Sequence, residues 1–186
     1  MTRIIAGTAG GRRIAVPRGD GTRPTSDRVR EALFSSIIAE LGSLEGLGIL
    51  DLYAGSGALG LEALSRGAAR ALLVESDRNA AATIRRNIDT LGLAGAELVQ
   101  SRVEAVLVRQ PRGGRYDVLL ADPPYSRADS EIESVLNLAT EWLLPNALLV
   151  VERSSRAGAV PWPAGFHSVR ARRYGDTMLW YGRAAV

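Results

Sequence analysis

Two short segments of the sequence combine acids with glycines or prolines in patterns that are common at ligand-binding and catalytic sites. The segment "DLYAGSGALG" begins with Asp51 and continues through Gly55, Gly57 and Gly60, while "ADPPY" holds Asp122, two prolines and a tyrosine. Glycines let the chain turn tightly and let a ligand approach the backbone, and a helix start offers free N–H groups. Two successive prolines fix two φ angles and remove two donors. The first segment predicts a ligand-binding loop, and the second predicts a rigid corner that presents acceptors.

The glycine spacing has two interpretations. G-x-G-x-x-G after a strand is typical of dinucleotide-binding proteins, and Glu75 lies 20 residues beyond Gly55, where an acid binds a ribose hydroxyl. Asp51, however, precedes the glycines by four residues and leaves room for a carboxylate near the amino group of an amino-acid-like ligand. S-adenosylmethionine has such a group, a ribose and no pyrophosphate, so we expect this cofactor. A nicotinamide cofactor is the alternative, and it leaves "ADPPY" unexplained.

The "ADPPY" segment suits methylation of an exocyclic amine on a nucleobase. Such an amine is a poor nucleophile because its lone pair is delocalised into the ring. Two acceptors on its hydrogens, the Asp122 carboxylate and the Pro123 carbonyl, would direct the lone pair toward a sulfonium methyl group. Pro124 adds rigidity, and Tyr125 would stack on the base, a contact worth about 1–3 kcal/mol. We therefore expect direct displacement at the amine.

Alternating apolar runs and helical patterns surround both segments. Strand-like runs cover 48–54, 69–76, 96–100, 116–122 and 146–153, and helical patterns cover 58–66, 78–92, 102–110 and 130–143. This alternation predicts an α/β fold with a parallel sheet covered on both faces. An earlier helix should start after an N-cap at Ser26 and end at Gly42, and Asp77 should cap the helix that follows it. A last hairpin turning at Gly175-Asp176 completes the pattern of Rossmann-like methyltransferases, a seven-stranded mostly parallel sheet whose last strand is antiparallel.

The N-terminal residues differ from the rest of the sequence in their glycine-rich composition and in their charge. The pieces "RIIAG" and "RRIAV" predict a β-hairpin that turns between Thr8 and Gly11, so we expect an extension over 1–22 and the main domain over 23–186. Net charge is +3, yet residues 1–30 hold seven arginines against two acids. Arginine suits phosphate contacts and base stacking, which indicates a nucleic-acid partner; a solvated basic arm is the alternative.

Composition excludes several classes of site. Cysteine is absent and His167 is the single histidine, so we expect no disulfide, no cysteine nucleophile and no metal site. The sequence shows neither the apolar segment of a secretory signal nor a run long enough to span a membrane. We expect a cytoplasmic protein without a membrane partner.

Several segments together resemble the RsmD family of bacterial 16S ribosomal RNA guanine-N2 methyltransferases. They are "RPTSDRVREALFSSI", "LDLYAGSGALGLEALSRGA", "VESD", "ADPPY" and "YGDTMLWYG", and the similarity runs from Arg3 to Tyr181. The resemblance implies a class I S-adenosylmethionine-dependent enzyme that methylates a guanine, number 966, of 16S RNA. It implies that the substrate RNA lies within an assembling or assembled 30S subunit. We also expect a monomer.

The resemblance also implies roles for individual residues. The catalytic corner is Asp122, Pro123, Pro124 and Tyr125. The cofactor residues are Asp51, Tyr53, Gly55, Ser56 and Gly57 for the methionine part and Glu75 with Ser76 for the ribose. In a sheet of this kind the end of the third strand borders the adenine, so we also expect the backbone of Arg102 and Val103 to contact it. The expected RNA contacts are Arg3, Arg12, Arg13, Arg23, Arg28 and Arg30, with Arg172 and Arg173 as weaker candidates. The segment "RPTSDRV" is expected to close over the cofactor side.

Two other functions stay open at this point. "ADPPY" also serves adenine-N6 methylation, although 186 residues leave no separate target-recognition domain of the kind that a sequence-specific DNA enzyme needs. A non-catalytic RNA-binding assembly factor could use the basic arm alone.

Overall fold

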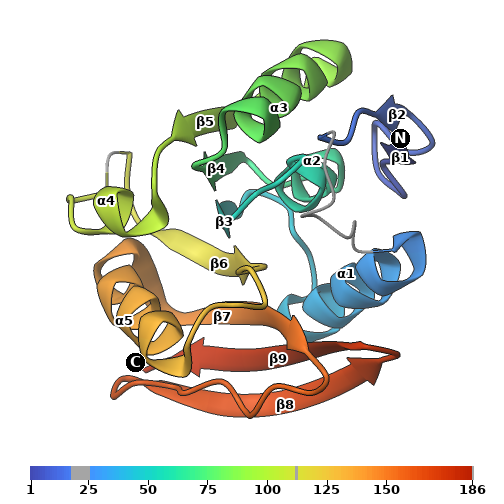
Figure 1. The fold of residues 1–186 in the computed structure, drawn as a ribbon. Helices are drawn as coiled ribbons and strands as arrows, with labels where there is room; N and C mark the ends of the chain where they lie inside the picture. Colours follow the sequence, from blue (N-terminus) through green and yellow to red (C-terminus); the bar gives the residue numbers. More distant parts are fainter. Residues whose placement is uncertain (18–25, 112, 186) are drawn as a thin grey trace.

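A seven-stranded sheet organises the protein. The computed structural model describes residues 1–17, 26–111 and 113–185 (Figure 1). The strands of the sheet are β3 (Gly48–Leu52), β4 (Arg70–Glu75), β5 (Ala96–Gln100), β6 (Tyr116–Ala121), β7 (Leu143–Ser154), β8 (Phe166–Tyr174) and β9 (Thr177–Ala184). Their order is β5-β4-β3-β6-β7-β9-β8, and β9 runs antiparallel to both of its neighbours. The predicted sheet, with its antiparallel last strand, is confirmed.

Helices cover both faces of this sheet (Figure 1). They are α1 (Asp27–Leu41), α2 (Ala58–Ser65), α3 (Arg78–Leu91), α4 (Val103–Leu107) and α5 (Asp129–Ala139), which a 3-10 turn, η1 (Thr140–Trp142), extends. The helix expected over 102–110 is shorter than predicted, since α4 ends at Leu107. The two predicted N-caps are confirmed: Ser26 Oγ accepts from the Val29 amide at 3.3 Å, and Asp77 Oδ1 accepts from the Ala80 amide at 2.8 Å. Within the described ranges, no helix has the length and apolar character needed to cross a bilayer.

Alternating side chains of the central strands build two cores. On β6, Val118 and Leu120 join the core under α1, α2 and α3, whereas Leu119 and Ala121 join the core under α4 and α5. This alternation follows from the period of two residues in a strand. Both faces of β3 and β6 are therefore buried, and only the strand ends are left to hold a site.

The N-terminal hairpin shares one of these cores. Its strands, β1 (Thr2–Arg3) and β2 (Arg13–Ile14), pair antiparallel beside α2 and α3 (Figure 1) and are shorter than predicted. Ile4 and Ile14 are almost fully buried, and Glu62 of α2 accepts from the amides of Ile5 and Ala6 at 2.7 and 3.0 Å. The hairpin is thus docked, although the sequence indicated an appendage.

A second set of hydrogen bonds ties the hairpin to the glycine loop. Asn87 of α3 accepts from the Ala15 amide at 2.8 Å and donates to the carbonyls of Ala15 and Ser56, each at 2.9 Å. Gly7 has φ +82°, and a Cβ there would lie 1.8 Å from the Ser65 carbonyl oxygen, so the hairpin approaches α2 too closely for any other residue. The start of the chain and the loop that follows β3 are therefore parts of one packed unit.

Candidate active site

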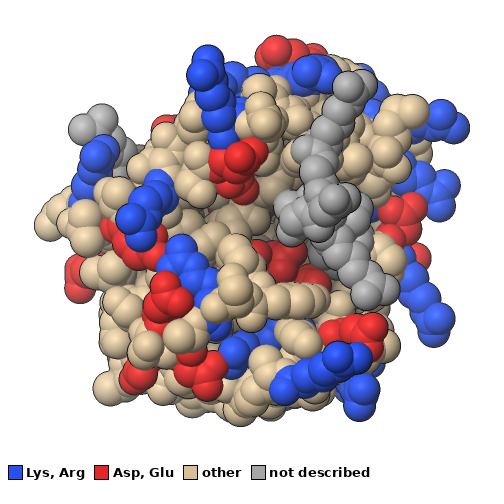
Figure 2. Space-filling model, in the orientation of Figure 1, with Lys and Arg blue, Asp and Glu red and all other residues tan. Residues whose placement is uncertain are grey.

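The two segments singled out in the sequence lie side by side at the carboxyl edge of the sheet. Leu52, the last residue of β3, pairs in parallel register with Ala121, the last residue of β6. Tyr53 and Asp122 therefore come directly after two neighbouring strands, and such strands lie about 4.8 Å apart. The strand order reverses between β3 and β6, the place where open α/β sheets bind ligands. Figure 2 shows this face hollowed near its centre, with acidic side chains in the hollow and arginines around its rim.

Left-handed backbone shapes the glycine loop after β3. Gly55 and Gly57 have φ of +58° and +78°, and Tyr53 has φ of +59° although it carries a side chain. Such a conformation costs a non-glycine residue about 1–3 kcal/mol and is concentrated at functional sites. A Cβ on Gly57 would lie 2.9 Å from a Leu73 methyl carbon, so that glycine also lets α2 start against β4.

Two acids hold the glycine loop in shape. Asp51 is 1% exposed, and its Oδ2 accepts from the Gly60 amide at 2.9 Å. Burial raises the pKa of Asp51 to about 7; the bond from Gly60 opposes this shift and the charge of Glu75 adds to it. Glu75 accepts from the Gly55 amide at 2.9 Å and from the Asp77 amide at 2.7 Å. Each carboxylate offers about four lone-pair sites, so Glu75 keeps acceptor capacity for a ligand hydroxyl.

The remaining cofactor residues predicted from the sequence lie at the same edge of the sheet. Ser76 follows Glu75 in an exposed position, and Arg102 and Val103 form the N-cap and first residue of α4. The Ser101 amide donates to the Glu75 carbonyl at 3.0 Å, which places the end of β5 beside the end of β4. The structure thus brings all the predicted cofactor residues to the ends of β3, β4 and β5.

The Asp-Pro-Pro-Tyr corner continues directly from β6. The Asp122 amide donates to the Leu52 carbonyl at 3.4 Å, and the Arg127 amide donates to the Pro124 carbonyl at 2.9 Å, which closes a turn. Burial raises the pKa of Asp122 well above its usual range, and the charges of Glu152 and Asp51 raise it further. Tyr125 is 55% exposed, so much of its side chain faces outward.

Two further residues of this site were missed in the sequence. Arg127 pairs with Glu104 of α4 at 2.5 Å, and its guanidinium lies 5.5 Å from the centre of the Tyr53 ring, so it links the corner to the glycine loop. Glu152 of β7 is 6% exposed and lines a small pocket with Pro123, Pro124 and Tyr125. A signal existed for Glu152, because it ends the apolar run "ALLVVE" as Glu75 and Asp122 end theirs. In the ranges that the structure describes, no group of three or more acidic or histidine side chains is arranged to hold a metal ion.

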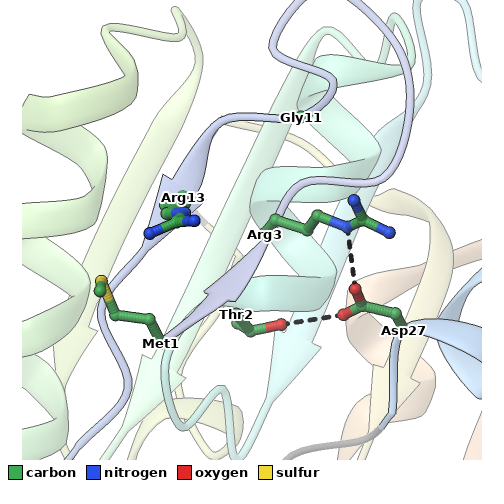
Figure 3. Close-up of a pocket in the computed structure, with 6 residues that line it drawn as sticks. All are labelled: Met1, Thr2, Arg3, Gly11, Arg13 and Asp27. Atoms are coloured by element: carbon green, nitrogen blue, oxygen red, sulfur yellow. Dashed lines mark hydrogen bonds and ion pairs between the residues drawn. The ribbon is translucent and has the colours of Figure 1, made fainter.

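The arginines predicted to bind RNA have different surroundings. Arg3, Arg13 and Arg28 are exposed, and Figure 3 shows Arg3 turned toward Asp27, at 3.0 Å, in a pocket that Arg13 also lines. Arg12 instead donates to the Thr90 and Leu91 carbonyls at the end of α3, the latter at 2.7 Å.

Arg30 is wrongly predicted as a surface contact. It is 1% exposed and donates to the Arg3 carbonyl and to Asp27 at 2.7 and 2.8 Å, so its guanidinium ties α1 to the hairpin. Arg23, with the first residues of "RPTSDRV", lies outside the described residues. Arg172 and Arg173 are on β8, the edge strand of the sheet.

Comparison with known proteins identifies the family. The family model described as "Conserved hypothetical protein 95" matches residues 2–183. The chain is also 38% identical over 176 residues to Ribosomal RNA small subunit methyltransferase D of Escherichia coli strain K12, covering 94% of this chain and 85% of the relative. The chain belongs to the RsmD family.

Solved structures agree with this assignment to the RsmD family. A candidate methyltransferase from Escherichia coli, yhhF, superposes with a TM-score of 0.86 at 35% identity and covers 99% of this chain and 98% of its own. A more distant methyltransferase, SMU.776, solved in complex with SAH, has a TM-score of 0.70 at 16% identity over 88% of this chain and 50% of its own. The latter likeness is one of fold, and both confirm the methyltransferase architecture.

The raised pKa of Asp51 predicts a pH-dependent stability. The folded protein keeps the Asp51 proton up to about pH 7, whereas the unfolded chain releases it near 3.8. Between these two pH values the folded state binds more protons than the unfolded state. The stabilising contribution of protonated Asp51 is therefore lost as the pH rises from about 4 to 7. The parent should therefore lose about 2–3 kcal/mol of unfolding free energy between pH 5 and pH 8, and Asp51→Asn should not lose it. The difference in unfolding free energy, variant minus parent, should rise by the same amount over this range.

Urea denaturation at a series of pH values measures this difference. Asp89→Asn, on the exposed face of α3, is the matched control and should leave the difference constant. A flat difference for Asp51→Asn as well would show that Asp51 is ionised throughout the range.

Proposed function

We propose that this protein transfers a methyl group from S-adenosylmethionine to the exocyclic N2 amine of a guanine in small-subunit ribosomal RNA, by family resemblance guanine 966. The observation that supports this most is the parallel pairing of β3 with β6, which sets the glycine loop beside the Asp-Pro-Pro-Tyr corner. The name of the Escherichia coli relative, a small-subunit ribosomal RNA methyltransferase, supports the substrate class.

The residues of the glycine loop fit a ligand with an amino group and a ribose. A Cβ on Gly55 would meet no atom nearer than 4.0 Å, so the outer side of that glycine is open to a close approach. Asp51 offers a buried carboxyl for an ammonium, whose charge would favour the ionised form, and Glu75 offers an acceptor for ribose hydroxyls. The backbone at Arg102 and Val103 would border the adenine. When bound, S-adenosylmethionine supplies the electrophilic methyl group.

The corner after β6 would hold and activate the amine. Asp122 and the Pro123 carbonyl accept the two amine hydrogens, so the nitrogen lone pair is left to face the methyl group. The bond from nitrogen to the methyl carbon forms as the sulfur–carbon bond breaks, and one amine proton must leave. Burial raises the pKa of the Asp122 carboxyl, so its ionised form is suited to accept that proton and then to release it to solvent.

The substrate base must be unstacked to reach this corner. Exposed aromatic surface on Tyr125 suits stacking on the plane of a base that is already single-stranded or is flipped out. We infer that the partner is 16S RNA in an assembling or assembled small subunit, and that the protein acts as a cytoplasmic monomer. In this proposal residues 1–22 form the RNA-binding extension of a methyltransferase domain over 23–186.

Transfer to ribosomal RNA tests the function directly. Small subunits from cells that lack the endogenous methylation are incubated with the protein and labelled S-adenosylmethionine, and the product nucleotide is identified by mass spectrometry. N2-methylguanine at one position is the expected result. Methylation of adenine N6 would favour the alternative amine, and cofactor binding without transfer would leave a binding role alone.

Loss of the Asp122 carboxylate should slow turnover without weakening cofactor binding. A charge-assisted hydrogen bond contributes roughly 1.5–3 kcal/mol, so Asp122→Ala should lower kcat by one to two powers of ten. Calorimetric titration with S-adenosylhomocysteine should give an unchanged Kd, because the carboxylate contacts the amine. Asp89→Ala on α3 serves as the control, and parental turnover in Asp122→Ala would remove Asp122 from the reaction.

The surroundings of the hairpin arginines predict which of them bind RNA. Arg13→Glu should weaken binding to 16S RNA and lower the slope of log affinity against log salt by about 1–2, because it removes a phosphate contact and adds a repulsion. Arg12→Ala should instead lower protein stability, because the Arg12 guanidinium satisfies carbonyls at the end of α3. Filter binding across a salt series measures the slope, with Arg109→Glu, exposed beyond α4, as control. An unchanged slope for Arg13→Glu would exclude this part of the hairpin from the interface.

A further inference from the structure

We propose that Arg127 is a positioning residue, which fixes the Asp-Pro-Pro-Tyr corner against the glycine loop through an ion pair with Glu104. The inference rests on the proposed function, since it concerns how the same two segments are held at transfer distance. Strand pairing fixes the place where β6 ends, but it does not fix the turn that follows Asp122. Contacts outside the sheet must hold that turn.

The corner is a short connection between β6 and α5, and the sheet anchors its first end. β6 ends at Ala121, and the Asp122 amide then donates to the Leu52 carbonyl at 3.4 Å. Pro123 and Pro124 restrict the backbone but have no N–H group, so neither can tie the turn to its surroundings by donating a backbone hydrogen bond. The orientation of the corner therefore depends on how its second end is held.

Arg127 anchors the second end of the corner. Its amide donates to the Pro124 carbonyl at 2.9 Å and closes the turn. Its guanidinium donates to Glu104 of α4 at 2.5 Å and to Glu131 of α5 at 3.3 Å. Glu131 also accepts from the amide of Ala128, the N-cap of α5, at 2.9 Å. One side chain thus fastens the end of the corner to the first turns of two helices.

The same guanidinium lies against the glycine loop. Its central carbon is 5.5 Å from the centre of the Tyr53 ring, within the range of a cation–π contact. Tyr53 has a left-handed backbone conformation, which is unfavourable for a residue with a side chain and persists only where its surroundings hold it. The side chains of Arg127 and Glu104 are 20% and 27% exposed, so water screens their ion pair less than it screens a fully exposed one. Arg127 therefore joins the corner, α4 and the glycine loop.

These contacts bear on the rate of methyl transfer. Direct displacement needs the amine and the methyl group close together and in line, and a misplacement of about 1 Å can lower the rate by about two powers of ten. Without the Arg127 side chain, the turn and the Tyr53 ring each lose a partner, and the corner can pivot about the end of β6. Asp51 and Glu75 still hold the glycine loop through its own amides, so cofactor affinity should be kept.

Three variants and a control test this role. Arg127→Met removes the charge, the double variant Arg127→Met with Glu104→Gln also removes the carboxylate that would be left unpaired, and Arg127→Lys keeps the charge without the planar fork. Arg115→Met is the matched control, because Arg115 forms an exposed ion pair with Glu141, at 3.5 Å, just before β6 begins. The measured quantities are kcat for methyl transfer to small subunits that lack the methylation, Kd for S-adenosylhomocysteine and the midpoint of urea denaturation.

Loss of the Arg127 guanidinium should separate turnover from cofactor binding. Arg127→Met should lower kcat by about ten- to a hundredfold and change Kd by less than about threefold, because the corner moves while the acids of the glycine loop stay in place. The double variant should resist urea better than Arg127→Met, since no carboxylate is left unpaired, yet its kcat should stay low. Arg127→Lys should have a kcat between those of the parent and Arg127→Met, and Arg115→Met should keep the parental kcat.

The outcomes distinguish this inference from the proposed function. A folded Arg127→Met variant with the parental kcat would overturn the positioning role while methyl transfer stands, and so would a double variant whose kcat recovers together with its stability. If Arg127→Met does not fold, Arg127→Lys and the single variant Glu104→Gln take its place; both should lower kcat, and parental kcat in both would overturn the role. Failure of the parental protein to methylate small subunits would overturn the proposed function itself.

Discussion

The pairing of β3 with β6 is the constraint on which the site depends. Leu52 opposite Ala121 brings the glycine loop and the Asp-Pro-Pro-Tyr corner, 71 residues apart from Asp51 to Asp122, to one edge of the sheet. A slip of one residue would turn every side chain of β6 to the opposite face. Leu119 and Leu120 pack into different cores and so oppose such a slip, which means that core packing sets the position of Asp122.

The electrostatics of the site follow from that geometry. Parallel strands that end together bring their terminal acids together, and burial beside like charges makes Asp51 and Asp122 hold protons more tightly than exposed carboxyls do. The ionised forms of these carboxyl groups are unfavourable in the site without a ligand. A partner that brings hydrogen-bond donors or a cation would stabilise them. Both the ammonium of S-adenosylmethionine and the donor edge of guanine meet this requirement.

The arginines at and beside the N-terminal hairpin have different roles. Arg30 of α1 is buried and donates to the Arg3 carbonyl, and Arg12 is exposed but donates to carbonyls at the end of α3. Arg3 and Arg13 face outward and line a pocket with Asp27. Asn87 connects the same hairpin to the glycine loop through Ala15 and Ser56. RNA bound at the hairpin would therefore contact a surface that is packed against the cofactor loop.

Local patterns in the sequence were enough to predict the alternation of strands and helices, the caps at Ser26 and Asp77, the last hairpin and the two segments of the site, because each depends on local periodicity or on adjacent residues. Three features became visible only in the folded chain: Glu152 follows β7 residues that pair beside Asp122, Arg127 contacts Glu104 and Tyr53, and Arg30 is buried. These depend on which distant strands pair and on how much water each side chain loses, and a run of arginines or a single acid at a strand end has the same local pattern whether it is buried or exposed. Strand pairing and burial are properties of contacts between segments far apart in the chain, so a local pattern cannot show them.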